Sequence, residues 1–191
     1  MSTLEAISTL LGVACVGLGV VRSWWTFPTA IASVALLGIV VARERLYSDA
    51  LLQLFFIAAN LYGWREWRRS RSAAGEVVVE RMANGERLRW LAGAVVAAAA
   101  WGAAMRLFTD ASYPWWDAGV ASASIAAQLL MARRKWENWA IWIAVDLASV
   151  PLYSAKHLWA FAGLYVIYLA LAVCGLLDWT RAGRVARAAA A

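Results

Sequence analysis

Two tryptophans and an aspartate share one face of an apolar segment. Trp139, Trp142 and Asp146 follow one another at spacings of three and four residues, so they line one side of a helix. Two indole rings beside a carboxylate suit a flat, positively charged ring. The pattern predicts a binding slot. The alternative interpretation is that the tryptophans anchor the segment at a membrane interface and Asp146 bonds a neighbouring helix.

Other polar side chains also interrupt apolar runs. Gln53 and Asn60 lie seven residues apart on one face of residues 48–64, and Tyr165 lies within residues 158–177. Polar groups inside a membrane are costly and are usually kept for function or for bonds between helices. We therefore expect Gln53 and Asn60 to contribute to the site, whereas Tyr165 either completes it or packs.

The sequence lacks the motifs of catalysis and of metal binding. It contains no HExxH, GxSxG or phosphate-binding loop, and Cys15 and Cys174 both lie inside apolar runs, where they read as packing residues. No basic residue lies well inside an apolar run, so nothing holds a phosphate there. We expect no enzyme, no cofactor and no metal. The net charge of +6 fits basic residues placed between membrane spans better than it fits a nucleic-acid-binding surface.

The composition is that of a membrane protein. The 191 residues are 63% hydrophobic and 16% charged, whereas soluble domains carry about 25% charged residues. Seven apolar segments each approach the roughly 20 residues that a helix needs to cross a bilayer. Their ranges are 4–21, 26–42, 48–64, 90–108, 114–132, 137–154 and 158–177. The sequence predicts an all-α integral membrane protein with seven transmembrane helices.

The basic residues divide unevenly between the two sides of such a bundle. All but four of the 18 fall on one side, half of them in the connection 65–89. The exceptions are Arg43, Arg45, Arg106 and Lys156. By the positive-inside rule we expect a multi-pass plasma-membrane protein with its C-terminus in the cytoplasm and its N-terminus outside. We interpret 65–89 as a solvated polybasic connector, with a small hairpin near residues 77–85 as the alternative.

One helix ending occurs twice in the chain. Gly63 and Trp67 recur as Gly175 and Trp179, 112 positions later, and at this shift residues 22–69 align with 134–181 without a gap. The match pairs the first three spans with the last three, which predicts two parallel three-helix repeats around a linking helix, a 3+1+3 arrangement. Chance similarity between Trp-Arg interface anchors is the alternative. The expected divisions are a first repeat (1–67), a cytoplasmic basic loop (68–89), a linking helix (90–110), a second repeat (111–180) and a cytoplasmic tail (181–191).

Three motifs together resemble those of the PnuC family of vitamin transporters. They are Asn-x-Tyr-Gly-Trp-x-x-Trp at 60–67, Glu-Asn-Trp-x-x-Trp at 137–142, and Asp146 with Pro-Leu-Tyr at 151–153. The resemblance covers nearly the whole chain. It implies a SWEET-like fold, a homotrimer in the bacterial inner membrane, and facilitated diffusion of nicotinamide riboside that cytoplasmic phosphorylation then traps. It also implies substrate-binding roles for five residues: Asn60, Trp64, Asn138, Trp139 and Trp142.

The residues and the resemblance agree on the kind of substrate. Nicotinamide riboside is a flat cation, and the absence of buried arginine suits the riboside better than its phosphorylated form. Thiamine, another flat cation, fits the same stripe and stays the alternative, as does a membrane binding protein that transports nothing. The predicted substrate-binding set is Gln53, Asn60, Trp64, Asn138, Trp139, Trp142, Asp146 and Tyr165.

Overall fold

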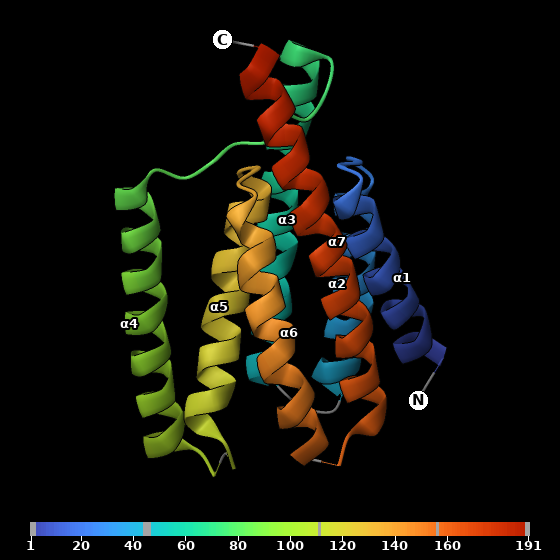
Figure 1. Ribbon diagram of the computed structural model, residues 1–191. Helices are drawn as coiled ribbons and strands as arrows, with labels where there is room; N and C mark the ends of the chain where they lie inside the picture. Colours follow the sequence, from blue (N-terminus) through green and yellow to red (C-terminus); the bar gives the residue numbers. More distant parts are fainter. Residues whose placement is uncertain (1–2, 44–46, 111, 156, 190–191) are drawn as a thin grey trace.

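Seven α-helices form an elongated bundle in the computed structural model of the chain (Figure 1). The structure describes residues 3–43, 47–110, 112–155 and 157–189, without the side chains of 47–50 and 186–189. The N-terminus lies at one end of the bundle and the C-terminus at the other (Figure 1). We call the end that carries residues 65–89 and the turns after α1 and α5 the arginine-rich end. The helices are α1 (Thr3–Val20), α2 (Thr26–Arg43), α3 (Tyr47–Ala74), α4 (Asn84–Phe108), α5 (Pro114–Ala132), α6 (Glu137–Ala155) and α7 (Trp159–Ala189).

Six of these helices close a ring. Each packs on the next in the order α1, α2, α3, α5, α6, α7, and α7 packs back on α1. The helix α4 lies outside the ring, where it packs against α5 (Figure 1). The ring order repeats after three helices, as two parallel three-helix units joined by α4 require. The predicted 3+1+3 arrangement of seven helices is confirmed.

The turns that end α1 and α5 have the same backbone geometry. Arg22 and Arg134 adopt left-handed φ angles of 55° and 60°, which are uncommon for residues other than glycine. The N–H of Ser23 donates to the Leu18 carbonyl at 2.9 Å, and 112 positions later the N–H of Lys135 makes the same bond to residue 130. A shared strained turn supports duplication of the unit over chance similarity of interface residues.

Four of the described helices are long and apolar enough to be candidate membrane spans: α1, α2, α4 and, in α7, the part Trp159–Val185. The other three helices carry amide or acidic side chains that the ring buries, among them Gln53, Gln128 and Asp146. A polar residue is tolerated at membrane depth when it faces the protein interior. Lower hydropathy therefore marks the three ring helices that bury these amide and acidic side chains.

The helices extend beyond the predicted spans at the arginine-rich end. α3 continues to Ala74 and α4 begins at Asn84, so the expected loop 68–89 is helical at both ends. The expected tail 181–191 is likewise helical through Ala189. Arginine, glutamate and alanine are good helix formers, so the charged runs prolong the helices. Because Asn84 opens α4, the hairpin interpretation is wrong.

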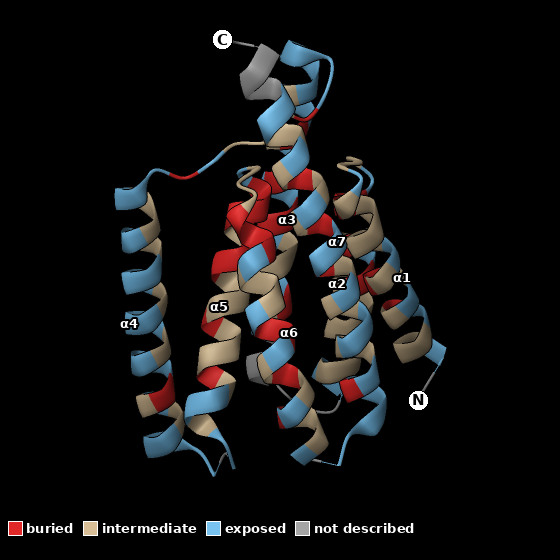
Figure 2. Ribbon diagram, viewed as in Figure 1, coloured by how far each residue is buried: buried red, intermediate tan, exposed pale blue. Residues whose placement is uncertain are grey.

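Burial is concentrated in the ring, toward the arginine-rich end (Figure 2). In contrast, α4 is exposed along most of its length, and Leu91, Val95 and Val96 are each about 60% exposed or more. A large apolar surface of this kind is the surface that lipid or another protein covers.

Candidate substrate pathway

One buried carboxylate lies in the middle of the ring. Asp146 of α6 is 3% exposed and interacts electrostatically with Tyr165 and Tyr168 of α7. The ring of Tyr153 stacks on Tyr165 with centroids 5.1 Å apart. In the described part of the chain, no lysine or arginine forms an ion pair with Asp146. A buried carboxylate without a basic partner suits a cationic ligand, because the ligand's charge would offset the free-energy cost of removing the carboxylate from water.

Tyr168 of α7 reaches across the contact between α7 and α1 and lies beside α1. A Cβ added at Gly12 would lie 2.6 Å from the Tyr168 hydroxyl oxygen, so the glycine makes room for that hydroxyl. The Ser33 Oγ lies beside the same position, and it donates to the Ser8 carbonyl at 2.7 Å. Hydroxyl groups of α2 and α7 therefore meet the backbone of α1 at this level of the ring.

A pair of carboxamides links α3 to α5. The Gln128 Nε2 donates to the Asn60 Oδ1 at 3.0 Å, and the Asn60 Nδ2 donates to the Phe56 carbonyl at 2.8 Å. Gln53 lies on the same face of α3, and all three amide side chains are at most 8% exposed. Amides both donate and accept, so this face can bind polar groups of a ligand. Gln128 was not in the predicted set; its only signal in the sequence is that it interrupts an apolar run.

Four aromatic rings close the interior at the arginine-rich end. Trp67 and Trp179 lie with centroids 5.6 Å apart, the edge of Phe27 meets Trp67 at 4.9 Å, and Trp139 meets Trp179 at 5.7 Å. All four are at most 1% exposed. Phe27 and Trp139 are equivalent positions of the two repeats, as are Trp67 and Trp179. The axis that relates the repeats therefore passes between Trp67 and Trp179. We call these four residues the aromatic plug.

The two repeated glycines give the plug its space. A Cβ at Gly63 would lie 2.4 Å from the ring of Phe27, and a Cβ at Gly175 would lie 2.5 Å from the ring of Trp139. Neither distance is possible without a shift of helix or ring. The repeated glycine is therefore required by the close approach of an aromatic ring to the helix backbone.

Each repeated tryptophan also fastens one repeat to the other. The Trp67 Nε1 donates to the Met131 carbonyl at 3.1 Å, which joins α3 to α5. The Trp179 Nε1 donates to the Gly19 carbonyl at 3.1 Å, which joins α7 to α1. These two helix contacts are the seams between the repeats. A buried indole N–H needs a partner, so both bonds hold the seams closed.

Ion pairs repeat the same pattern at the rim of the ring. Arg22 pairs with Asp178 at 2.5 Å across the α1–α7 seam. Its equivalent Arg134 lies 3.9 Å from the Glu66 carboxylate across the α3–α5 seam and also donates to the Glu66 carbonyl at 3.4 Å. The interior is closed at this end by a plug, two indole bonds and two ion pairs.

Residues 75–83, which we call the strap, cover the plug from outside. Val77 and Met82 are 6% and 5% exposed, and Val77 packs in the same cluster as the plug. The Glu80 N–H donates to the Arg134 carbonyl at 2.9 Å, and the Trp136 N–H donates to the Glu80 carbonyl at 3.1 Å. The interpretation of this connection as only a solvated linker is wrong for the strap.

Charged groups fix the strap in place. The Glu80 carboxylate pairs with Arg134 at 2.6 Å and with Lys135 at 3.0 Å. Burial raises the pKa of Glu80, but hydrogen bonds from Lys135 and Arg134 outweigh burial and hold it below the ordinary glutamate value. At the far end of the strap, the Glu137 Oε1 accepts from the Met82 N–H at 3.0 Å and from the Arg87 Nη2 at 2.7 Å.

The structure places three predicted site residues of α6 at or beside the plug. Trp139 belongs to the plug itself, and Trp142 packs partly buried against it. Asn138 is fully buried at the start of α6, where its Nδ2 donates to the Lys135 carbonyl at 2.6 Å. Its Oδ1 has no hydrogen-bond partner among the described groups. An unpaired buried oxygen is costly, so the Asn138 Oδ1 is an acceptor that a ligand group could satisfy.

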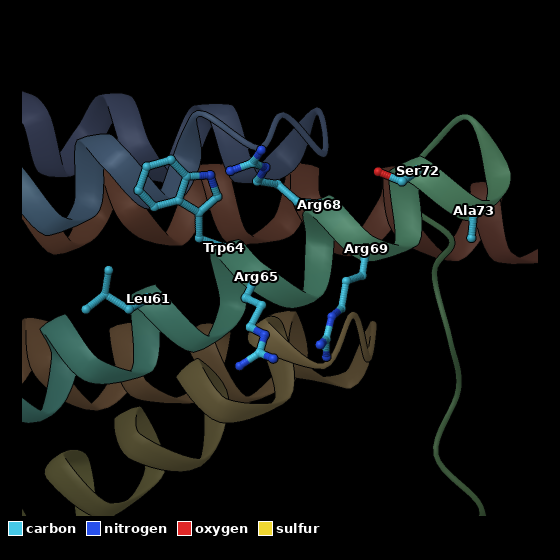
Figure 3. A pocket seen from close by; sticks show the side chains of 7 residues that line it. All are labelled: Leu61, Trp64, Arg65, Arg68, Arg69, Ser72 and Ala73. Carbon is cyan, nitrogen blue, oxygen red and sulfur yellow. The ribbon is translucent and has the colours of Figure 1, made fainter.

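Trp64 packs partly buried against the same cluster as Trp142. Its ring stacks on Trp24 at 6.1 Å, and it lines a hollow on the outer surface of α3 (Figure 3). The structure therefore brings Asp146 together with Tyr165, holds Asn60 against Gln128, and packs Trp64 against the cluster that contains the plug.

Comparison with known proteins decides the family. Residues 2–181 match the model of the family described as "Nicotinamide mononucleotide transporter". The chain belongs to this family. The ring of helices, with its polar interior closed at one end, is thus the interior of a multi-pass membrane transporter.

Relatives and a solved structure cover nearly the whole chain. The chain is 28% identical over 209 residues to "Nicotinamide riboside transporter PnuC" of Escherichia coli (strain K12), covering 96% of this chain and 87% of the relative. It is 35% identical over 180 residues to "Riboflavin/roseoflavin transporter RibM" of Streptomyces davaonensis, covering 92% and 83%. The "Crystal structure of the Vitamin B3 transporter PnuC" has a TM-score of 0.77 and 24% identity, covering 95% and 82%. The resemblance to the PnuC family and the membrane fold are confirmed.

Proposed function

We propose that the chain carries nicotinamide riboside across the membrane through the interior of the ring. The observation that carries the proposal is Asp146, a carboxylate 3% exposed beside Tyr165 and Tyr168 and without a basic partner among the described residues. A pyridinium ring would pair with the carboxylate and stack on the tyrosines. The amide face of Gln53, Asn60 and Gln128 offers hydrogen bonds to the carboxamide and ribose hydroxyls.

The same interior favours the riboside over the mononucleotide named in the family description. A phosphate needs arginine, lysine or several N–H donors. The buried polar residues described by the structure include no arginine and no lysine. The riboside therefore fits the interior without an uncompensated anion beside Asp146.

Riboflavin is the second candidate, and the 35% identity to the riboflavin/roseoflavin transporter favours it. Riboflavin is uncharged, so it would not need Asp146. Thiamine, a cation, remains the alternative predicted from the sequence. The three vitamins therefore differ in how strongly their transport should depend on the carboxylate.

The remaining expectations concern orientation and assembly. We place the arginine-rich end in the cytoplasm and the N-terminus outside, because positive loops remain inside. The chain then acts as a facilitator without catalytic activity, and cytoplasmic phosphorylation traps the substrate. The exposed apolar face of α4 supports assembly with further copies, in keeping with a homotrimer.

Uptake into proteoliposomes tests the function directly. We expect labelled nicotinamide riboside to enter vesicles that contain the protein faster than empty vesicles. Asp146→Asn should reduce uptake at least tenfold, because one ion pair in a water-poor interior is lost, whereas Ser154→Ala on the same helix should not. Uptake of riboflavin that is faster and unaffected by Asp146→Asn would identify riboflavin as the substrate. Uptake of none of the three vitamins would contradict the proposed function.

A further inference from the structure

A hollow of about 690 Å³ lies on the outer surface of α3 at the arginine-rich end (Figure 3). Its lining residues are Leu61, Trp64, Arg65, Arg68, Arg69, Ser72 and Ala73. Leu61, Arg65, Arg68 and Ser72 succeed one another at helical spacing and form one stripe. Because Asn60 and Trp67 on the other face of α3 are buried in the ring, this stripe faces away from the substrate pathway.

The hollow is positively charged and largely unneutralised. Arg65 and Arg69 project to one side of α3 and Arg68 to the other, so guanidinium groups flank the hollow on both sides (Figure 3). Neither Arg65 nor Arg68 has a hydrogen bond or ion pair with the residues that the structure describes. Arg69 holds Glu66 only loosely, at 3.4 Å with 62% of its side chain exposed. Free guanidinium groups bind phosphate oxygens strongly.

An apolar track leads along the same face of α3 to the hollow. Leu51, Leu54 and Leu61 are 67%, 61% and 51% exposed on the side of the helix that bears Arg65 and Arg68. Exposed leucines that lead to a cluster of arginines form a surface complementary to an amphiphilic molecule. Its acyl chain would lie on the leucine track and its anionic headgroup in the hollow. A soluble phosphate would use the arginines and leave the track empty.

We propose that this hollow binds the phosphate headgroup of an anionic phospholipid of the leaflet at the arginine-rich end. Arg65 and Arg68 bind the phosphate, Ser72 offers a hydroxyl donor, and an acyl chain lies on Leu54 and Leu61. A lipid bound at this site would hold α3 at a fixed depth in the bilayer. Because α3 forms one side of the α3–α5 seam, the lipid would also fix the position of that seam. The proposal does not depend on which vitamin is transported.

Binding of phosphatidylglycerol to the intact protein tests the site. The probe is native mass spectrometry and thermal unfolding in nanodiscs of phosphatidylcholine with or without 30% phosphatidylglycerol. We expect phosphatidylglycerol to remain bound and to raise the unfolding temperature of the wild type. Arg65→Gln/Arg68→Gln should weaken binding about thirtyfold, because each basic residue near an anionic leaflet is worth roughly fivefold in affinity.

A charge-matched variant separates a site from general attraction. Arg81→Gln/Arg89→Gln removes two exposed arginines from the same end of the protein and should leave the phosphatidylglycerol effect unchanged. Equal losses in the two double variants would overturn the proposal. Stabilisation of wild type by millimolar inorganic phosphate in pure phosphatidylcholine, abolished by Arg65→Gln/Arg68→Gln, would assign the hollow to a soluble anion and overturn the lipid as occupant.

Discussion

Gly175 shows how one residue controls the closure of the interior. A methyl group at this position would lie 2.5 Å from the Trp139 ring, so Gly175→Ala must displace the ring or the helix. We expect the free energy of unfolding to fall by about 1–3 kcal/mol, less the gain of up to about 1 kcal/mol that alanine brings to a helix. Denaturant or thermal unfolding in detergent measures the change.

Gly163 of the same helix is the matched control. A Cβ added there meets no atom within 4 Å, so Gly163→Ala should leave stability unchanged or slightly raised. Equal destabilisation by the two substitutions would show that the plug does not depend on this close approach.

The sequence predicted some site residues well because helical spacing reveals shared faces. Asp146 and Gln53 are buried in the ring, as a polar residue inside an apolar run indicates. Spacing does not reveal partners, so neither the bond between Asn60 and Gln128, 68 positions apart, nor the place of Trp139 in the plug could be predicted. The substrate-binding roles of these residues stay predictions.

At the scale of elements, the strap is the part that the sequence concealed. Its valines look like those of any short connection, and their burial depends on tryptophans from α3 and α7 that meet only after the ring has closed. Its polar fastening depends in the same way on Arg134 and Lys135, which lie more than 50 positions later. Contacts between segments so far apart leave no local periodicity in the sequence.

The strap should loosen in acid. The folded-state pKa of Glu80 is lowered, so its ion pairs stabilise the strap fully above the ordinary glutamate pKa and are lost as the pH falls through the lowered value. We expect amide hydrogen exchange in residues 77–82, corrected for the intrinsic effect of pH, to accelerate between about pH 5 and pH 3. Glu80→Gln should exchange faster at pH 7 and lose most of this pH dependence.

Glu76→Gln provides the control within the strap, because residue 76 is exposed. It should keep the protection and the pH dependence of the wild type. An unchanged pH dependence in Glu80→Gln would mean that another group fastens the strap.

At the scale of the whole molecule, the sequence predicted the arrangement of helices but not the seams. Repeat alignment and the distribution of arginines both follow from sequence alone, and together they predict two parallel units of three helices. The two seams, by contrast, arise where the units meet. There the equivalent indole bonds of Trp67 and Trp179 and the ion pairs of Arg22 and Arg134 recur around one axis.

We expect transport through the ring to open these seams at the arginine-rich end, since the plug blocks the interior there. We expect a bifunctional thiol reagent that links Arg22→Cys to Asp178→Cys, with Cys15→Ser and Cys174→Ser, to reduce vitamin uptake at least tenfold. The link replaces a reversible ion pair by a covalent bond across the α1–α7 seam. Reduction of a cleavable reagent should restore uptake, which separates a locked seam from damage by the substitutions.

A second linked pair tests whether the seam itself is what must open. The Arg133 guanidinium carbon lies over the Trp90 ring, 5.3 Å from the ring centroid. This contact joins α5 to α4, and both helices lie on the same side of each seam. Linking Trp90→Cys to Arg133→Cys in the same background should leave uptake near that of the unlinked protein, because α4 packs on α5 and moves with it. If both links stopped uptake equally, motion between α4 and α5 would be part of the cycle. If neither did, the plug would open without parting the repeats, by rotation of its own rings.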